Sequence, residues 1–455
     1  MSERQVKSLI MAAGMSTRMK SAQSKVLHEV CGKRILDFVL DACRGAGIPE
    51  QILIVGAMRD QVQAAYAGAK DISWVVQEPQ LGTGHAVMAA EKALGDFQGD
   101  LVVIVGDAAM IRTETVKTLL ETHRREKAAV TLITAILKDP KWFGRIVRDS
   151  SGNLLRIVEA KDATPQEYAI KEVNPSFYAF RWPALKAVLR KITNHNVKKE
   201  YYLTDAIGLL IESGRKAVAF AAAQPEEVEA VNSREDLALV TSLMRRRILK
   251  ALMASGVTVE DPATTYVDWN VTVGQDTVIS PCTVIRGPSK IGANCRVGPL
   301  ANLRPGTVLE DGAEARAFVE TKNARLGKNV CARHLSYLGD IDIGAGTNVG
   351  CGTITANSDG RNKYHTEVGA NAYLGAGTLL VAPTSVGDGG RTGAGAVVTK
   401  SHPVPAGETY VGMPAKALKG SSKFKVQGSK SKVQSSKSKK PAPGSRKRRP
   451  GRTGR

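Results

Sequence analysis

Two groups of residues in this 455-residue sequence have types and spacings suited to chemistry on phosphates and amines. In the first group, an apolar run at 6–13 leads into a loop of small residues at 12–19, and Lys25 follows. Such a loop lets backbone N–H groups approach phosphates closely, and Arg18 and Lys25 add positive charge. A second apolar run ends in Asp107, and Mg²⁺ binds through one or two carboxylates together with substrate phosphates. Taken alone, each feature also fits a plain charged turn.

The second group surrounds His334. Cations, amides and a phenol lie near it in the sequence: Arg304, Lys322, Tyr337, Asn348, Asn357 and Lys363. Cations suit a sugar phosphate, and amides and a phenol suit hydroxyl groups. A neutral imidazole can remove a proton from an amine that attacks a thioester, because its pKa lies near working pH. A solvated polar loop is the alternative explanation.

The elements that position the first group alternate in type. Short apolar runs at 6–13, 51–55, 74–77 and 101–105 read as buried strands, and 35–44 and 85–94 have helical spacing. This alternation predicts β-α-β units around a mostly parallel sheet, which binds ligands at the carboxyl ends of its strands. A polar loop at 77–85 opens the second helix, and its amides suit base or phosphate contacts.

Residues 233–255 differ from this pattern. Their apolar residues recur every three or four positions, which predicts a helix of about six turns. Asn232 or Ser233 is a suitable N-cap, and Gly256 ends the run. We interpret this segment as a helix that connects two domains.

Beyond residue 258 the period becomes six. Apolar residues stand at perfect six-residue spacing at Val267, Val273, Ile279, Ile285, Ile291, Val297, Leu303 and Leu309. The period resumes at Val368, and glycines near the apolar positions permit tight corners. A repeat this short is typical of a solenoid, and three flat faces per turn make a triangular β-helix. The irregular stretch 315–366 is expected to interrupt the repeat with loops.

The net charge of +21 is unevenly distributed. Residues 421–455 contain 8 Lys and 5 Arg and no acidic residue, so the remaining 420 residues carry only +8. We expect this tail to be disordered, with weak contact to polyanions as the second interpretation. The sequence has neither a 20-residue apolar run nor a signal peptide, so we expect a cytoplasmic protein. The six cysteines show no metal-binding spacing.

Several motifs together resemble one known family. They are LIMAAGMSTRM, QLGTGHAV, VGDAA, GRIVRD and IVEAKDA in the first half, and FVETK, ARLG and HLSYLGD in the second. The sequence is similar over about residues 5–415 to the bifunctional bacterial N-acetylglucosamine-1-phosphate uridylyltransferases / glucosamine-1-phosphate acetyltransferases. The resemblance implies an α/β nucleotidyltransferase domain with a Rossmann-like mixed sheet (1–232), a linker helix (233–256), a left-handed parallel β-helix (257–420) and the basic tail (421–455).

The resemblance also implies ligands for the first site. Ala12, Ala13, Gly14, Arg18 and Lys25 would hold UTP phosphates, Gln77, Gly82 and Thr83 would contact uracil, and Met11 would also line this first site. Gly144, Glu159 and Asn174 would bind N-acetylglucosamine, and Asp107 and Asn232 would hold Mg²⁺. The reaction would be in-line attack of the sugar phosphate on the α-phosphorus of UTP, giving UDP-N-acetylglucosamine and pyrophosphate.

For the second site the resemblance implies acetyl transfer from acetyl-CoA to glucosamine-1-phosphate in a homotrimer. His334 would be the general base. The sugar-phosphate ligands would be Arg304, Lys322, Tyr337, Asn348 and Lys363, and the acetyl-CoA contacts Cys351, Asn357, Ser358, Ala376 and Ala394. Ser358 and Ala376 depart from the family pattern. The alternatives are a nucleotidyltransferase of other sugar specificity with weak or lost acetyl transfer, and a non-catalytic scaffold whose tail binds nucleic acid.

Overall fold

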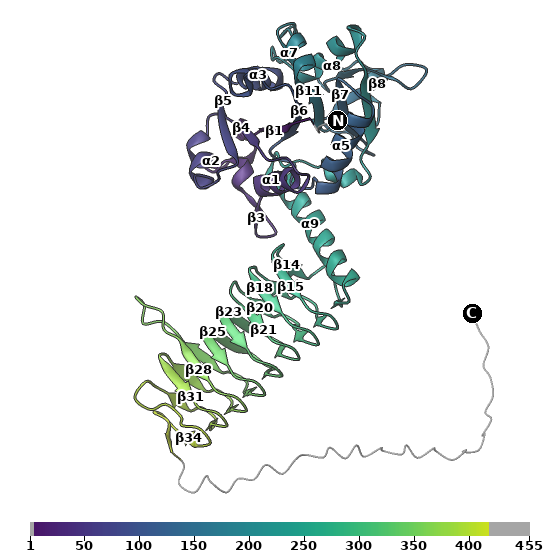
Figure 1. Cartoon of the computed structure of the whole chain (residues 1–455). Coiled ribbons are helices and arrows are strands. Elements are labelled where there is room, and N and C mark those ends of the chain that lie inside the picture. The colour runs from purple at the N-terminus through teal and green to yellow at the C-terminus, as the bar shows by residue number, and fades with distance from the viewer. Residues whose placement is uncertain (1–3, 418–455) are drawn as a thin grey trace, which may run out of the picture.

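The computed structural model describes residues 4–417, so the tail predicted at 421–455 lies outside the described residues. An α/β part and a β-helix lie at opposite ends of one long helix, α9 (Arg234–Ala254) (Figure 1). No helix within residues 4–417 is both long and apolar enough to span a lipid bilayer. The predicted fold class, an α/β domain with a Rossmann-like mixed sheet followed by a parallel β-helix, is confirmed.

The α/β part contains a mixed ten-stranded sheet, in which β12 pairs with β7 beside the main order β5-β4-β1-β6-β11-β7-β10-β8-β9. Its strands are β1 (Val6–Met11), β4 (Gln51–Val55), β5 (Ile72–Val76), β6 (Asp100–Val105), β7 (Val130–Ile136), β8 (Gly144–Arg148), β9 (Leu154–Val158), β10 (Glu172–Asn174), β11 (Tyr178–Arg181) and β12 (Ala217–Ala221). Strands β5, β4, β1 and β6 run parallel, as the β-α-β alternation predicted. A small hairpin, β2 (Glu29–Val30) and β3 (Lys33–Arg34), lies outside the sheet.

Helices cover both faces of this sheet. They are α1 (Ile35–Gly45), α2 (Arg59–Ala65), α3 (Thr83–Ala89), α4 (Glu91–Leu94), α5 (Thr113–Arg125), α6 (Pro165–Tyr168), α7 (Trp182–Leu189) and α8 (Leu203–Glu212). Apolar residues of α3, α4, α7 and α8 join one buried core, and those of α1, α2 and α5 join the core on the opposite face. The helix predicted at 85–94 is two helices that meet at Ala90, and the strand predicted at 6–13 ends at Met11.

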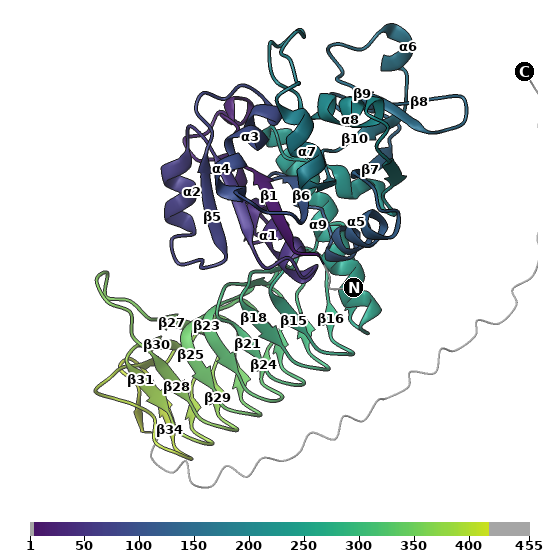
Figure 2. The same cartoon turned by 45° about the horizontal axis from the view of Figure 1, so that its top comes forward.

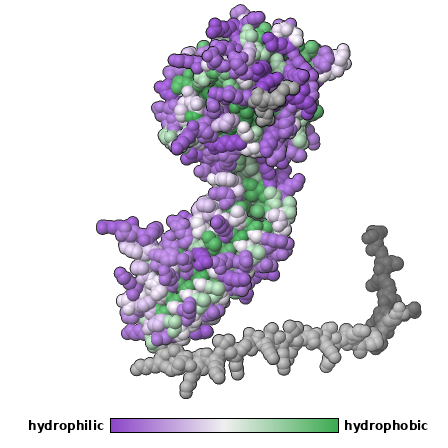
Figure 3. Space-filling model, viewed as in Figure 1, coloured by the Kyte–Doolittle hydropathy of each residue, from purple (hydrophilic) through white to green (hydrophobic). Residues whose placement is uncertain are grey.

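Helix α9 begins with a capping box and packs against both parts. The Ser233 hydroxyl accepts a hydrogen bond from the Asp236 backbone N–H, and the Asp236 side chain accepts one from the Ser233 N–H. Val240 and Met244 are buried against the α/β part, whereas Leu249 belongs to the β-helix core. Apolar residues gather at this neck, and the α/β part above it is mostly hydrophilic (Figure 3).

The β-helix stacks short parallel strands in coils (Figure 2). One face contains β13 (Thr258–Val259), β16 (Val278–Ile279), β19 (Arg296–Val297), β22 (Glu314–Ala315), β24 (Cys331–Ala332), β26 (Asn348–Val349), β29 (Tyr373–Leu374), β32 (Arg391–Thr392), β34 (Thr409–Val411) and β35 (Lys416–Ala417). The other faces contain β14 (Tyr266–Val267), β15 (Val271–Val273), β17 (Val284–Ile285), β18 (Ser289–Ile291), β20 (Asn302–Leu303), β21 (Val308–Leu309), β23 (Val319–Leu326), β25 (Ser336–Ile343), β27 (Ile354–Ala356), β28 (Thr366–Val368), β30 (Leu379–Val381), β31 (Thr384–Val386) and β33 (Val397–Val398).

The strand register explains the six-residue period. Val284 pairs with Asn302, 18 residues further on, so one coil is three six-residue steps. Each step turns one apolar side chain inward, and Ile279, Ile285, Val297 and Leu303 are fully buried.

The predicted interruption at 315–366 is largely wrong. Glu314 pairs with Cys331 and Cys331 with Asn348, each 17 residues on, so the coils continue with one residue fewer and the sequence period is lost. The single long insertion follows Ile354: Asp342 pairs with Glu367, 25 residues on. The fold therefore has one projecting loop in this stretch, at about 357–365.

The six-residue register makes a stability prediction. Replacing inward-facing Ile285 by Ala should lower the free energy of unfolding of the β-helix by roughly 2–5 kcal/mol, because it opens a cavity in a packed core. The matched variant is Val284→Ala on the same strand, whose side chain is not in the core and should cost under about 1 kcal/mol. Urea unfolding followed by circular dichroism measures both, and equal losses would contradict the register.

Candidate active sites

The first site is a cavity of about 430 Å³ at the carboxyl ends of β1 and β6. Met11 pairs with Val105 in register, so the loops after both strands leave the sheet side by side. Eleven predicted residues line the cavity: Met11, Ala12, Ala13, Gly14, Arg18, Lys25, Gln77, Gly82, Thr83, Asp107 and Asn232. The structure thus brings together residues that are up to 221 positions apart in the chain.

Two cations and two oxygen ligands meet on one side of this cavity. The Lys25 ammonium pairs with the Asp107 carboxylate and donates to Asn232 Oδ1 over 3.0 Å. Arg18 Nη2 donates to the same Asn232 oxygen, also over 3.0 Å. Asn232 directly precedes Ser233, the N-cap of α9, and its backbone N–H donates to Asp236. The start of the linking helix therefore holds the amide in the cavity.

This group of residues is suited to a divalent cation. Asp107 is 8% exposed, and its Oδ1 atom has no hydrogen-bond partner within residues 4–417. That oxygen and the Asn232 oxygen are the hard donors that Mg²⁺ prefers. Among the described residues no cluster of three or more His, Cys, Asp or Glu could hold a metal. A cation here has to take its remaining ligands from substrate phosphates and water.

The three predicted sugar ligands lie together at the edge of β8, β9 and β10. Gly144 pairs with Asn174, and Glu159 directly follows the last residue of β9. A Cβ atom on Gly144 would lie 3.6 Å from Glu159 Oε1, so the glycine leaves room beside that carboxylate. Burial raises the pKa of Glu159, and nearby Lys198 opposes the rise. The Asn174 amide donates to the Tyr178 hydroxyl over 2.6 Å, inside the protein.

Sequence reasoning missed several residues that line the nucleotide cavity. Gln80 donates to the Ala13 carbonyl over 2.5 Å and links the two loops. Ser16 accepts a hydrogen bond from the Lys25 N–H over 3.1 Å. Both residues stand inside quoted motifs, and that position was the available signal. Glu200 also lines the cavity, but nothing in its sequence context marks it.

The second site divides into two clusters. In the first, Leu303 pairs with Thr321 and Lys322 pairs with Gly339, so Arg304 and Lys322 lie one coil apart on the same face. Gly339 has no side chain, and a Cβ atom there would lie 2.5 Å from the Tyr337 hydroxyl and 2.9 Å from Asn357 Nδ2. We call Arg304, Lys322, Tyr337 and Asn357 the cation cluster. Asn357, expected at acetyl-CoA, therefore lies with the sugar-phosphate candidates.

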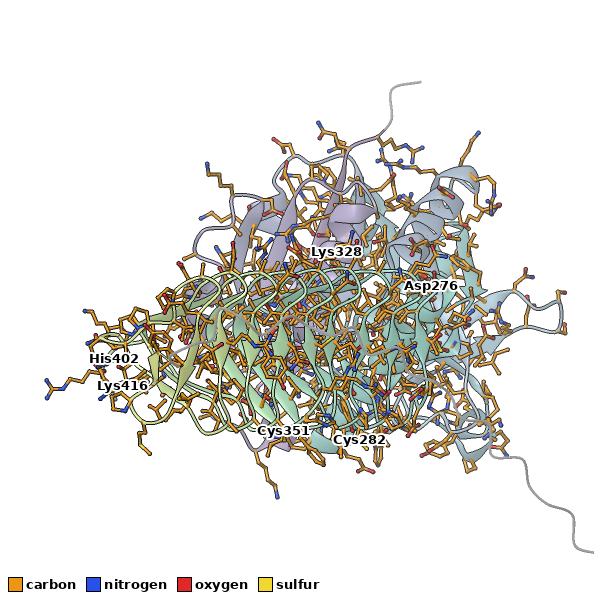
Figure 4. All side chains as sticks on the ribbon, turned by 90° about the horizontal axis from the view of Figure 1, so that it is seen from below. Asp276, Cys282, Lys328, Cys351, His402 and Lys416 are labelled. Carbon is orange, nitrogen blue, oxygen red and sulfur yellow. The ribbon has the colours of Figure 1, made fainter. Side chains whose placement is uncertain are left out.

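The second cluster is a column along one corner of the β-helix. Ala332 pairs with Val349 and Val349 with Leu374, so the residues two positions beyond each strand also stack. These residues are His334, Cys351, Ala376 and, one coil further, Ala394. All four are exposed. We call them the histidine column. In Figure 4, Cys351 lies along the lower edge of the β-helix, the same edge that carries Cys282 of an earlier coil.

The two clusters occupy different positions on the coil. His334 lies at a corner, before β25 begins at Ser336, whereas Lys322 pairs with Gly339 on the face that β23 and β25 form. Asn348 lies on the neighbouring face, beside the histidine column.

Lys363 and Ser358 pair across the projecting loop. The Asp359 carboxylate accepts backbone hydrogen bonds from Asn362 over 2.7 Å and Arg361 over 2.8 Å, and these hold the pKa of Asp359 below its usual range. The loop thus has its own internal order and extends beyond Asn357 at the end of the cation cluster.

Comparison with known proteins agrees with both halves of this description. A family model described as nucleotidyl transferase matches residues 7–226. The chain is 41% identical over 440 residues to the Bifunctional protein GlmU of Pelobacter propionicus, covering 89% of this chain and 95% of the relative. It is 40% identical over 429 residues to the protein of that name in Trichlorobacter lovleyi, covering 87% and 93%. The corresponding protein of Halalkalibacterium halodurans is 39% identical over 431 residues, covering 88% and 94%.

These relatives span the α/β part, the linking helix and the β-helix together. At this identity and coverage they establish the family, and they confirm the resemblance seen in the sequence motifs. The chain therefore belongs to the GlmU family of bifunctional enzymes, with a uridylyltransferase and an acetyltransferase activity.

Proposed function

We propose that the chain makes UDP-N-acetylglucosamine in two steps at the two sites described above. The β-helix transfers acetyl from acetyl-CoA to glucosamine-1-phosphate, and the α/β part transfers uridylyl from UTP to the product. The observation that carries the proposal is the meeting of Lys25, Asp107 and Asn232 in a cavity lined by a small-residue loop.

In the uridylyl step, the cavity of about 430 Å³ holds UTP, with its phosphates on the 12–14 backbone and on Lys25. A phosphate oxygen of the sugar phosphate attacks the α-phosphorus, the bond to the bridging oxygen breaks, and pyrophosphate leaves. Arg18 lines both this cavity and the neighbouring one that contains Glu159, so it neutralises charge where the two substrates meet. Alignment and charge neutralisation supply the catalysis.

We propose Mg²⁺ as the cation held by Asp107 and Asn232. Bound there, it supplies positive charge to phosphate oxygens during the transfer. The unpartnered Asp107 Oδ1 atom and the Asn232 oxygen support this assignment.

In the acetyl step, His334 acts as general base. The amine of glucosamine-1-phosphate attacks the thioester carbonyl while the imidazole accepts its proton, the C–S bond breaks, and the proton leaves with the CoA thiol. Arg304, Lys322 and Tyr337 hold the phosphate, with Lys363 and Asn348 as further sugar-phosphate ligands. Acetyl-CoA lies along the small residues Cys351, Ala376 and Ala394, which leave the corner open.

The separation of the clusters favours a homotrimer. Because the histidine column is exposed at a corner and Lys322 lies on a strand face, we propose that the histidine column of one subunit faces the cation cluster of the next. The complete acetyltransferase site then exists only between subunits. A cytoplasmic location, where both nucleotide substrates are available, stays a prediction.

Single substitutions should separate the two activities. Asp107→Ala should lower pyrophosphate release at least about 100-fold, since it removes a cation ligand, and leave acetyl transfer intact. His334→Ala should lower release of CoA thiol roughly 10²–10⁴-fold and leave uridylyl transfer intact.

The matched controls are exposed residues of the same types. Asp60, whose side chain is 96% exposed, and His365, at 47%, should tolerate Ala with both activities unchanged. Acetyl transfer that survives His334→Ala would show that another group is the base.

Mixed subunits test the shared site. His334→Ala and Lys322→Ala should each be inactive in acetyl transfer, but co-expression should restore about a quarter of the activity, because random trimers contain some interfaces with both intact residues. Co-expression of Arg304→Ala with Lys322→Ala should restore none, since both residues belong to one cluster. Failure of the first pair to recover would place the whole site within one subunit.

The raised pKa of Glu159 predicts a pH effect on sugar binding. The carboxylate becomes protonated at higher pH than an ordinary glutamate and then loses an acceptor for sugar hydroxyls. KM for N-acetylglucosamine-1-phosphate should therefore rise on mild acidification while KM for UTP stays nearly constant. Glu159→Gln should have a higher KM throughout and lose this dependence, beyond the titration of the sugar phosphate itself. An unaltered pH profile in that variant would exclude Glu159 as a sugar ligand.

A further inference from the structure

A second cavity, of about 470 Å³, lies beside the nucleotide cavity. It is lined by Arg18, Trp142, Glu159, Ala160, Lys161 and Lys198, and Arg18 is common to both cavities. Trp142 is 74% exposed, the second-largest exposed fraction among the large hydrophobic residues described. An indole with this much exposed area in a wall of cations and one carboxylate offers an apolar surface to a ligand.

The loop that contains Trp142 is anchored by the side chain of a buried residue on β8. It connects β7 to β8, and the Phe143 N–H donates to the Pro140 carbonyl over 3.2 Å, which closes a turn around Trp142. Lys141 has a left-handed backbone, with φ of 46°. Arg145, on β8, is 1% exposed, and its guanidinium donates to the Lys141 carbonyl over 3.3 Å and to the Phe143 carbonyl. The residues on both sides of Trp142 are therefore bonded to one buried side chain.

Arg145 has no carboxylate partner among the described residues. Its remaining hydrogen bond goes to the Tyr168 carbonyl over 3.2 Å, and the guanidinium lies 4.7 Å from the centre of the Tyr168 ring. Burying a guanidinium is unfavourable unless its donors are satisfied, and here every one of these hydrogen bonds goes to a backbone carbonyl. Two of those three carbonyls flank Trp142, so the buried guanidinium holds the backbone from which the tryptophan projects.

We propose that Trp142 is a specificity-determining residue that stacks on the apolar face of the sugar ring, and that Arg145 is its positioning residue. This inference rests on the proposed uridylyltransferase function and deepens it. A hexose presents ring C–H groups on one face and hydroxyls around its edge. The indole covers the C–H face, Glu159 accepts from hydroxyls, and Arg18, Lys161 and Lys198 meet the phosphate.

The test compares Trp142→Ala with Trp142→Phe in the full-length enzyme with Mg²⁺. Trp142→Ala should raise KM for N-acetylglucosamine-1-phosphate roughly three- to tenfold, the range expected for one aromatic contact, with KM for UTP unchanged. Trp142→Phe should retain most of the affinity. Because the side chain is exposed, neither variant should affect folding.

Binding is also visible without turnover. The chain has four tryptophans, and N-acetylglucosamine-1-phosphate should quench the emission of the unaltered protein but not that of Trp142→Phe. Arg145→Lys, which loses the guanidinium hydrogen bonds, should raise KM for the sugar phosphate with little change in kcat.

The results distinguish failure of the proposed uridylyltransferase function from failure of the role assigned to Trp142. If the unaltered enzyme releases no pyrophosphate from UTP with N-acetylglucosamine-1-phosphate, the proposed function itself fails. If it is active and Trp142→Ala keeps the same KM, or if the quenching persists in Trp142→Phe, the role of Trp142 is wrong. An Arg145→Lys variant with unchanged KM and quenching would remove its positioning role alone.

Discussion

Parallel strand pairing in register is the constraint on which both sites depend. In the α/β part, pairing of Met11 with Val105 brings the small-residue loop and Asp107 to one edge of the sheet. In the β-helix, the same kind of pairing stacks each residue on its counterpart one coil away, so His334 and Cys351 fall in one column. Backbone hydrogen bonds thus place the side chains, and the side chains supply the chemistry.

Sequence reasoning succeeded where a local pattern had one physical cause. The six-residue spacing follows from 18-residue coils, and that spacing alone identifies Ile285 and Leu303 as inward residues. It failed at 315–366, because 17-residue coils shift the apolar phase without altering the fold. Residues that are conspicuous only in three dimensions were also missed: Glu200 lies in the nucleotide cavity by tertiary packing, and Arg145 acts through backbone carbonyls.

The linking helix ties the two halves together through its two ends. Its N-terminal capping box fixes Asn232 in the nucleotide cavity, and Leu249 near its far end packs in the β-helix core. A second contact reinforces the joint: the Trp269 N–H of the first coil donates to the Cys31 carbonyl over 3.0 Å, and Lys33 lies 4.1 Å from the Trp269 ring centre. Asn232, a residue of the first site, is therefore held by the same helix that packs into the β-helix containing the second site.

The histidine column has a consequence for how this surface can change. Its spacing is set by strand separation, about 4.8 Å per coil, which no side-chain replacement at the corner alters. How far each residue projects from the corner depends only on its side chain, from the imidazole of His334 to the methyl groups of Ala376 and Ala394. The backbone therefore sets the distance between column residues, and each side chain separately sets the local shape of the corner surface. Column residues can thus be replaced one at a time without altering the fold of the coil.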